Sequence, residues 1–187
     1  MRDLARLIVR LVVGGLLAGH GAQKLFGWFE GPGPEGTRGM MASLDLHPPH
    51  RWAFLAGASE FGGGILTALG ALNPLGPLGI MGAMSMATAK VHLGKPIWAS
   101  AGGAELPVTN FAAALALTLA GPGRYSFDHM LGIRLPRWIG LAGLVGIGLV
   151  VRHAMQPAGS AAGAEAAEPA VTTVEIDEER EAELATA

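Results

Sequence analysis

The apolar stretch 52–72 contains one charged side chain, Glu60, and it constrains the fold more than any other part of the chain. As a helix, this stretch would be about 30 Å long, which is the thickness of a bilayer core. An ionised carboxylate at that depth costs about 2–3 kcal/mol or more, so it must face other helices or water, or be protonated. Four glycines lie close to it along the chain: Gly57, Gly62, Gly63 and Gly64. Glycine lets a neighbouring helix approach closely, so this stretch is suited to holding an acid inside a packed bundle.

Composition favours a membrane protein. Half of the 187 residues are hydrophobic, 15% are charged and 29 are glycine. This balance is typical of a polytopic membrane protein. The net charge of −2 gives no support to nucleic-acid binding. Cysteine is absent, which excludes disulfides, a thiol redox centre and thiolate-bound metal clusters within this chain.

The apolar runs predict an all-α membrane bundle of four core transmembrane helices and a short fifth helix. The expected spans are 4–29, 52–72, 76–93, 105–121 and 135–155. The last run is short for a span, and a tilted interfacial helix is its alternative. Residues 156–187 are acidic and poor in large apolar side chains, so we expect a disordered tail.

The first run begins among three arginines, as a signal peptide does, but it extends too far without a clear cleavage site. We expect an uncleaved helix whose N-terminus is cytoplasmic, with Gly15 and Gly19 forming its packing face. The Gly- and Pro-rich connection 30–51 is expected to be non-helical at its start, GPGPEG. Its segment 37–46 is read either as a surface loop or as a short amphipathic cap over the bundle.

Two tighter connections follow. The sequence NPLGP at 73–77 predicts a turn between antiparallel helices. The sequence GPGRYSFD at 121–128 breaks the fourth run. Within it, Asp128 either caps the next segment or pairs with Arg124, as a loop clamp or at a ligand.

The predicted topology brings several ionisable side chains to one level of the membrane. We take four of them as candidate catalytic residues, which would handle protons or a ligand: Glu60, Lys24, His92 and Glu105. Three more are candidate ligand-binding residues: His20, Lys90 and Asn110. Each has a purely structural alternative, since lysines extend to the membrane interface and histidines are common there. Their spacing matches no metal motif, so we predict no metal site.

Such a cluster is compatible with a quinone. A lysine or imidazole can donate a hydrogen bond to a quinone carbonyl, while a carboxylate transfers the proton. The chain carries no glycine fingerprint for nucleotides and no nucleophile–base pair of the hydrolase type.

Several motifs resemble those of the DoxX family of small bacterial membrane proteins. They are GHGxxKLF at 19–26, SEFGGGxL at 59–66, MxxAxxxxH at 84–92, a helix led by Glu105, and GPGRYSFD at 121–128. The resemblance covers about 4–131. It implies a compact bundle of four helices in the cytoplasmic membrane and a loose association with oxidoreductase systems. Relatives include a subunit type of thiosulfate:quinone oxidoreductase and components linked to thiol or oxidative-stress defence. Matching motif positions hold Lys24, Glu60, His92, Glu105 and Asp128.

Three functions are consistent with these features. The first is the membrane subunit of an oxidoreductase system, which binds quinone or relays protons. The second is a non-catalytic scaffold that anchors soluble redox-protein partners, and the third is a transporter of small solutes. In each case we expect a multi-pass protein of the cell membrane, in contact with the lipid bilayer. The oligomeric state is open, and the chain is at most an oxidoreductase subunit as an enzyme.

Overall fold

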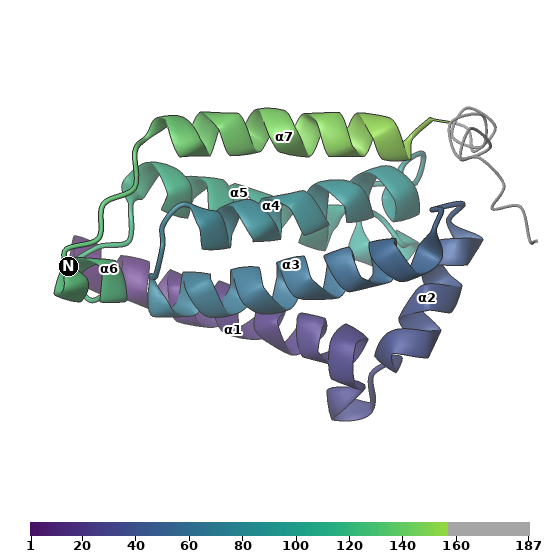
Figure 1. Ribbon diagram of the computed structural model, residues 1–187, viewed down its shortest axis with the longest axis horizontal. Coiled ribbons are helices and arrows are strands. Elements are labelled where there is room, and N and C mark those ends of the chain that lie inside the picture. Colours follow the sequence, from purple (N-terminus) through teal and green to yellow (C-terminus); the bar gives the residue numbers. More distant parts are fainter. Residues whose placement is uncertain (157–187) are drawn as a thin grey trace, which may run out of the picture. The chain divides into compact units, whose positions relative to one another are not determined.

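The computed structural model describes residues 1–156, and every regular element within that range is helical. This confirms the all-α class. Five longer helices run along one common axis: α1 (Arg2–Phe26), α3 (Pro49–Leu69), α4 (Leu75–Ala87), α5 (Glu105–Ala120) and α7 (Trp138–Ala154) (Figure 1). The predicted acidic tail lies outside the described residues, apart from Gln156.

Short elements occupy the two ends of the bundle. At one end lie α2 (Gly33–Ser43), a 3₁₀ turn η1 (Trp28–Glu30), a π-helical turn η2 (Thr88–His92) that continues α4, and a 3₁₀ turn η3 (Ala99–Ala101). At the other end lie the N-terminus and α6 (Phe127–Leu131) (Figure 1).

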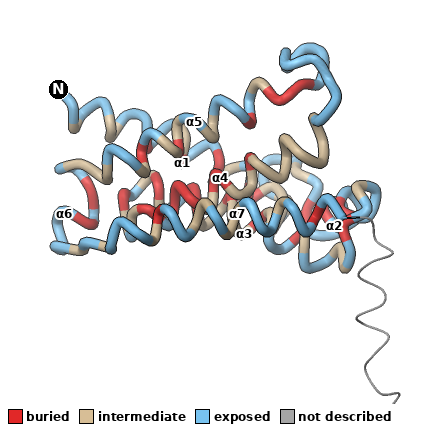
Figure 2. The backbone as a smooth tube through the Cα atoms, turned by 90° about the horizontal axis from the view of Figure 1, so that it is seen from above, coloured by how far each residue is buried: buried red, intermediate tan, exposed pale blue. Residues whose placement is uncertain are grey.

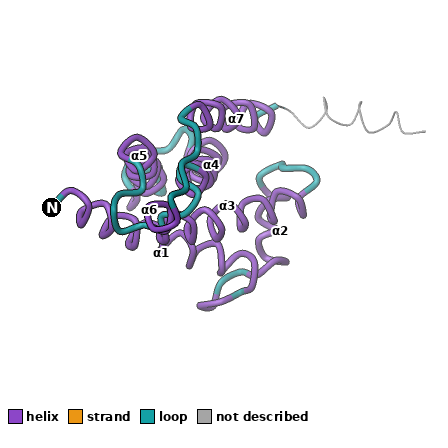
Figure 3. The backbone as a smooth tube through the Cα atoms, turned by 60° about the vertical axis from the view of Figure 1, so that its left-hand side comes forward, coloured by secondary structure: helices purple, strands orange, loops and turns teal. Residues whose placement is uncertain are grey.

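Helix α4 is the centre of the packing, with α3, α5 and α7 around it, while α1 packs on α3 (Figure 3). Ile80 and Met81 of α4 are fully buried, and Leu17 of α1 and Ala114 of α5 contact the same apolar core. A second, smaller core joins α2, α3 and the end of α7 through Met41, Leu46, Ala53 and Ala154. The helices are therefore held mainly by apolar and small side chains.

Helices α1 and α3 touch backbone to backbone along a glycine seam. A methyl group on Gly64 would lie 2.6 Å from the carbonyl oxygen of Gly14, closer than any real contact of that kind. The prediction that Gly15 and Gly19 form the packing face of this helix was wrong, because a methyl group at either position would have no neighbour within 4 Å. The seam lies one position away on the helix, which is a rotation of about 100°.

The connection after α1 is more helical than expected. Helix α2 begins at Gly33, inside the segment GPGPEG, so the prediction that this segment is non-helical was wrong. Proline is accommodated because Pro34 lies in the first turn, where a backbone N–H has no partner within the helix. The short amphipathic segment expected at 37–46 is the second half of α2 and the turn after it.

The turn between α3 and α4 is short, and these helices are antiparallel neighbours, as the NPLGP sequence predicts (Figure 1). Helix α4 begins at Leu75 and therefore takes Pro77 into its first turn. Its partner α3 ends at Leu69 and is capped by Gly70, which has φ 65°, a left-handed conformation that glycine adopts without strain.

Among the described helices, α1 is the one that is long and apolar enough by itself to cross a membrane, and α5 and α7 are shorter apolar helices. Exposed residues run along every one of these helices (Figure 2), and many of them are large and apolar. On α7, Leu141, Val145 and Leu149 form one exposed stripe at four-residue spacing.

Candidate functional site

A groove of about 340 Å³ lies between α3 and α7 at the α2 end of the bundle. Helix α4 forms its floor through Gly82, Ala83 and Met86. Trp52 and Leu55 of α3 line the groove, and α2 and α7 add further apolar side chains, among them Met40, Met41, Ile147 and Val150. Cavities that hold small ligands have volumes of about 300–1,000 Å³, so this groove is large enough for one.

Three charged side chains line this mainly apolar groove, Lys24 of α1, Glu60 of α3 and Lys90 of η2, and Ser59 of α3 is its one other polar lining residue. Glu60 is buried, with 5% of its surface exposed. Lys24 Nζ donates to both carboxylate oxygens of Glu60, at 2.5 Å each. A hydrogen bond between two ionised groups is short and strong, and it offsets part of the cost of removing both charges from water.

The glycine seam places this ion pair. A methyl group on Gly21 would collide with the backbone of Phe61, and one on Gly57 would lie 2.7 Å from Leu25. Helices α1 and α3 are therefore in close contact one turn before Lys24 and beside Glu60. Because the last turn of α1 is held this close, the lysine side chain can reach the carboxylate on α3.

Lys90 closes the groove from the α4 side. It is half-buried, and its Nζ donates to the carbonyl oxygen of Ala154 at the end of α7, at 3.2 Å. An ammonium group has three donors, and the described residues give Lys90 one hydrogen bond, so it retains donors for a ligand. It lies in the π-helical turn η2, and π-turns are frequent at functional sites.

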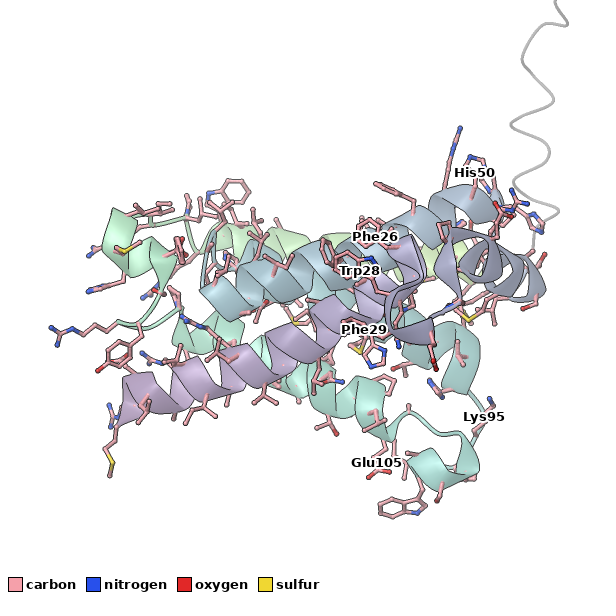
Figure 4. All side chains as sticks on the ribbon, turned by 90° about the horizontal axis from the view of Figure 1, so that it is seen from below. Phe26, Trp28, Phe29, His50, Lys95 and Glu105 are labelled. Atoms are coloured by element: carbon pink, nitrogen blue, oxygen red, sulfur yellow. The ribbon has the colours of Figure 1, made fainter. Side chains whose placement is uncertain are left out.

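Two other predicted residues, at the end of η2 and at the start of α5, flank the loop between these elements and do not line the groove. His92 Nδ1 is 2.7 Å from the carbonyl oxygen of Gly102, and Glu105 Oε2 accepts from the backbone N–H of Ala99 at 2.8 Å. Both side chains thus fix the connection between η2 and α5. Figure 4 shows Glu105 at the edge of the molecule, far from His50 at the start of α3.

The expected cluster therefore divides. Lys24, Glu60 and Lys90 come together in the groove, whereas His92 and Glu105 hold a loop. His20 is exposed on α1 and Asn110 is half-buried on α5, and neither lines the groove. In residues 1–156 no group of three or more histidines and carboxylates is arranged to hold a metal ion.

Asp128 has a structural role that neither sequence alternative described. It is buried, and its two carboxylate oxygens accept from the backbone N–H groups of Leu72 at 2.7 Å and Asn73 at 2.8 Å. It therefore holds the turn between α3 and α4. The cap of α6 is Ser126, whose Oγ accepts from His129 N at 3.1 Å.

Arg10 is a buried residue that sequence reasoning did not single out. Its guanidinium donates to the carbonyl oxygens of Pro122 and Tyr125, the latter at 2.6 Å, and it joins α1 to the loop before α6. A charged residue inside an apolar run was the available signal, because such a side chain needs polar partners.

A model of the DoxX family matches residues 5–93, a range that contains α2, α3, α4 and η2 and all of α1 except its first three residues. Lys24, Glu60 and Lys90 all lie inside this range, whereas α7 lies beyond it. No curated protein and no solved structure shows significant similarity to the chain.

Proposed function

We propose that this protein is a multi-pass subunit of an oxidoreductase system in the cytoplasmic membrane. We further propose that it binds a quinone in the groove between α3 and α7. The DoxX match over residues 5–93 supports the first part, because DoxX is a membrane protein family. The observation that carries the proposal is the Lys24–Glu60 ion pair, in the wall of a groove whose other lining residues are apolar apart from Lys90 and Ser59. A quinone needs both features, because its ring and tail are apolar while its carbonyl oxygens accept hydrogen bonds.

The dimensions of the bundle support its placement in a membrane. Helix α1 has 25 residues and α3 has 21, which gives lengths of about 37 and 31 Å. The hydrocarbon core is roughly 30 Å thick. Exposed aromatic side chains mark both ends: Trp28 and Trp98 at the η1 end, and Tyr125 and Trp138 at the α6 end. Such rings favour the two membrane–water interfaces.

The groove lies on the side of the bundle, and its outer edge includes exposed apolar side chains, among them Leu55 and Val150. In a bilayer these side chains would face the acyl chains. A ligand dissolved in the lipid could then enter sideways, between α3 and α7, without passing through water. A polyprenyl quinone is dissolved in the bilayer in this way.

The charged residues have distinct tasks in this proposal. Lys90 and Lys24 donate hydrogen bonds to carbonyl oxygens, and Glu60 keeps the Lys24 ammonium oriented at the groove wall. Lys24, whose side chain is 21% exposed, can release a proton toward a reduced oxygen and regain one from water, and two such cycles supply both protons. The bound quinone would supply the two-electron, two-proton chemistry, and a partner protein of the oxidoreductase system would supply both electrons.

The test is direct binding of a short-chain quinone to the purified protein in micelles, measured by equilibrium titration. Lys90→Met is expected to raise Kd about tenfold or more, because a hydrogen bond from a charged donor contributes about 1.5–3 kcal/mol. Glu105→Gln is the control, since this carboxylate lies outside the groove. Equal affinities of wild type and Lys90→Met, or a similar loss in both variants, would refute quinone binding at this site.

A further inference from the structure

A second cavity lies at the opposite end of the bundle, where the N-terminus and α6 are found (Figure 1). It has a volume of about 610 Å³ and is open to the surroundings. Three parts of the chain that are distant in sequence form its walls. They are the first turns of α1, Asn73 in the α3–α4 turn, and the continuous segment 122–137, which includes α6.

Four arginines line this cavity: Arg6, Arg124, Arg134 and Arg137. Its two carboxylates are already engaged. Asp3 accepts from Arg6 at 3.0 Å and from the backbone N–H of Arg124 at 3.2 Å. Asp128 accepts from two backbone N–H groups of the α3–α4 turn.

Among residues 1–156, the side chains of Arg124, Arg134 and Arg137 thus have no carboxylate partner, and all three are exposed. Three guanidinium groups around one cavity make its electrostatic potential positive, which favours the binding of an anion there. The fork of N–H donors on each guanidinium matches the oxygen atoms of a phosphate, which lysine cannot bind in the same bidentate way.

The surroundings of the cavity indicate where this anion comes from. Trp138 and Leu141 follow Arg137 directly in α7, and both are strongly exposed. Leu131 of α6 is also exposed, at 61%. An arginine cluster bordered by exposed apolar and aromatic side chains is suited to the membrane surface, where phosphate groups lie above acyl chains.

We propose that this cavity, the α6-end cavity, binds the phosphate group of an anionic phospholipid. The proposal rests on the membrane placement given above but not on quinone binding. In the orientation expected from the sequence, with a cytoplasmic N-terminus, this cavity faces the cytoplasmic leaflet, which carries anionic lipids.

The experiment compares binding of phosphatidylglycerol and phosphatidylcholine, with identical acyl chains, to the full-length protein in neutral micelles. Native mass spectrometry counts bound lipid, and the shift of the unfolding temperature reports affinity. The test variant is Arg134→Gln/Arg137→Gln. The matched control is Arg51→Gln/Arg152→Gln, which removes two exposed arginines at the other end.

The wild type is expected to bind phosphatidylglycerol in preference to phosphatidylcholine. The test variant should bind phosphatidylglycerol about 10- to 30-fold more weakly, since each cation near an anionic surface contributes about 1 kcal/mol. The control variant should match wild type. Arg134→Lys/Arg137→Lys should keep part of the affinity, because the charges remain while the bidentate geometry is lost.

Inorganic phosphate and glycerol 3-phosphate are added as competitors to identify the source of the phosphate. If they displace phosphatidylglycerol at similar concentrations, the phosphate site is upheld and its ligand is soluble. Equal binding of the two lipids by wild type would overturn the proposal, and so would equal losses in the test and control variants. Quinone titration of the same variants should be unchanged, so failure of one proposal is distinguishable from failure of the other.

Discussion

The Lys24–Glu60 ion pair can be tested by a double-mutant cycle. The single variants are Lys24→Met, which keeps the length of the side chain, and Glu60→Gln, which keeps its shape. Glu60 has 6% of its side chain exposed and Lys24 has 21%, so the carboxylate is the more deeply buried partner. The described residues give the Glu60 carboxylate no hydrogen-bond donor other than Lys24.

The two single variants should therefore differ in cost. Lys24→Met leaves a buried carboxylate with neither a counter-charge nor a donor, and breaking such a pair typically costs about 3–5 kcal/mol. Glu60→Gln keeps a carbonyl oxygen that Lys24 Nζ can bond, and Lys24 is partly exposed, so we expect a cost of about 1–2 kcal/mol. The double variant removes both charges. It should be no less stable than Lys24→Met, which gives a coupling energy of at least about 1–2 kcal/mol.

The assay is reversible unfolding in mixed micelles, followed by far-UV circular dichroism as the fraction of denaturing detergent increases. All four proteins are measured at the same total detergent concentration. If the losses in unfolding free energy add to within about 0.5 kcal/mol, the two residues are not coupled. The reasoning from the 2.5 Å contacts would then be refuted.

Three further outcomes are expected. Gly64→Ala should lower the unfolding free energy by about 1–3 kcal/mol, because its methyl group would meet the backbone of α1; Gly62→Ala, with open space at its methyl position, should be neutral or stabilising in the same assay. Asp128→Ala should cost about 2–3 kcal/mol, since two backbone N–H groups of the α3–α4 turn lose their acceptor, and an unchanged unfolding free energy would contradict this role. Ala83→Phe should fill the floor of the groove and weaken quinone binding more than tenfold in the titration, while the unfolding free energy stays near that of wild type. Undiminished binding by this variant would show that the quinone binds outside the groove.

The helical fold was predictable because apolar runs are long and their breaks contain proline and glycine. The start of α5 at Glu105 and the short turn before α4 follow directly from such punctuation. The glycine seam was harder to predict. Gly14, Gly15 and Gly19 are all glycines in the same apolar run, so the sequence does not distinguish them. Only the rotation of α1 against α3 places Gly14 in the contact.

In the candidate site, too, the sequence identifies some residues, while the fold decides which of them come together. Glu60 was identifiable because a carboxylate in an apolar run needs a partner, and Lys24 was within reach in the expected topology. His92 and Glu105 carry the same chemistry in the sequence, but the η2–α5 loop folds back and supplies them with backbone partners. Sequence spacing does not reveal where a loop of this length turns. The π-helical turn that carries Lys90 has no sequence signature either.

Stability alone does not account for an ion pair at the wall of the groove. Replacing both partners of a buried pair by apolar residues of similar size is often neutral or even stabilising, whereas removing one partner is costly. Lys24→Met/Glu60→Leu is therefore expected to fold about as well as wild type. If this variant folds and no longer binds quinone, the charges serve the ligand and not the fold. If it folds and binds quinone as wild type does, the groove acts through its apolar walls and Lys90 alone.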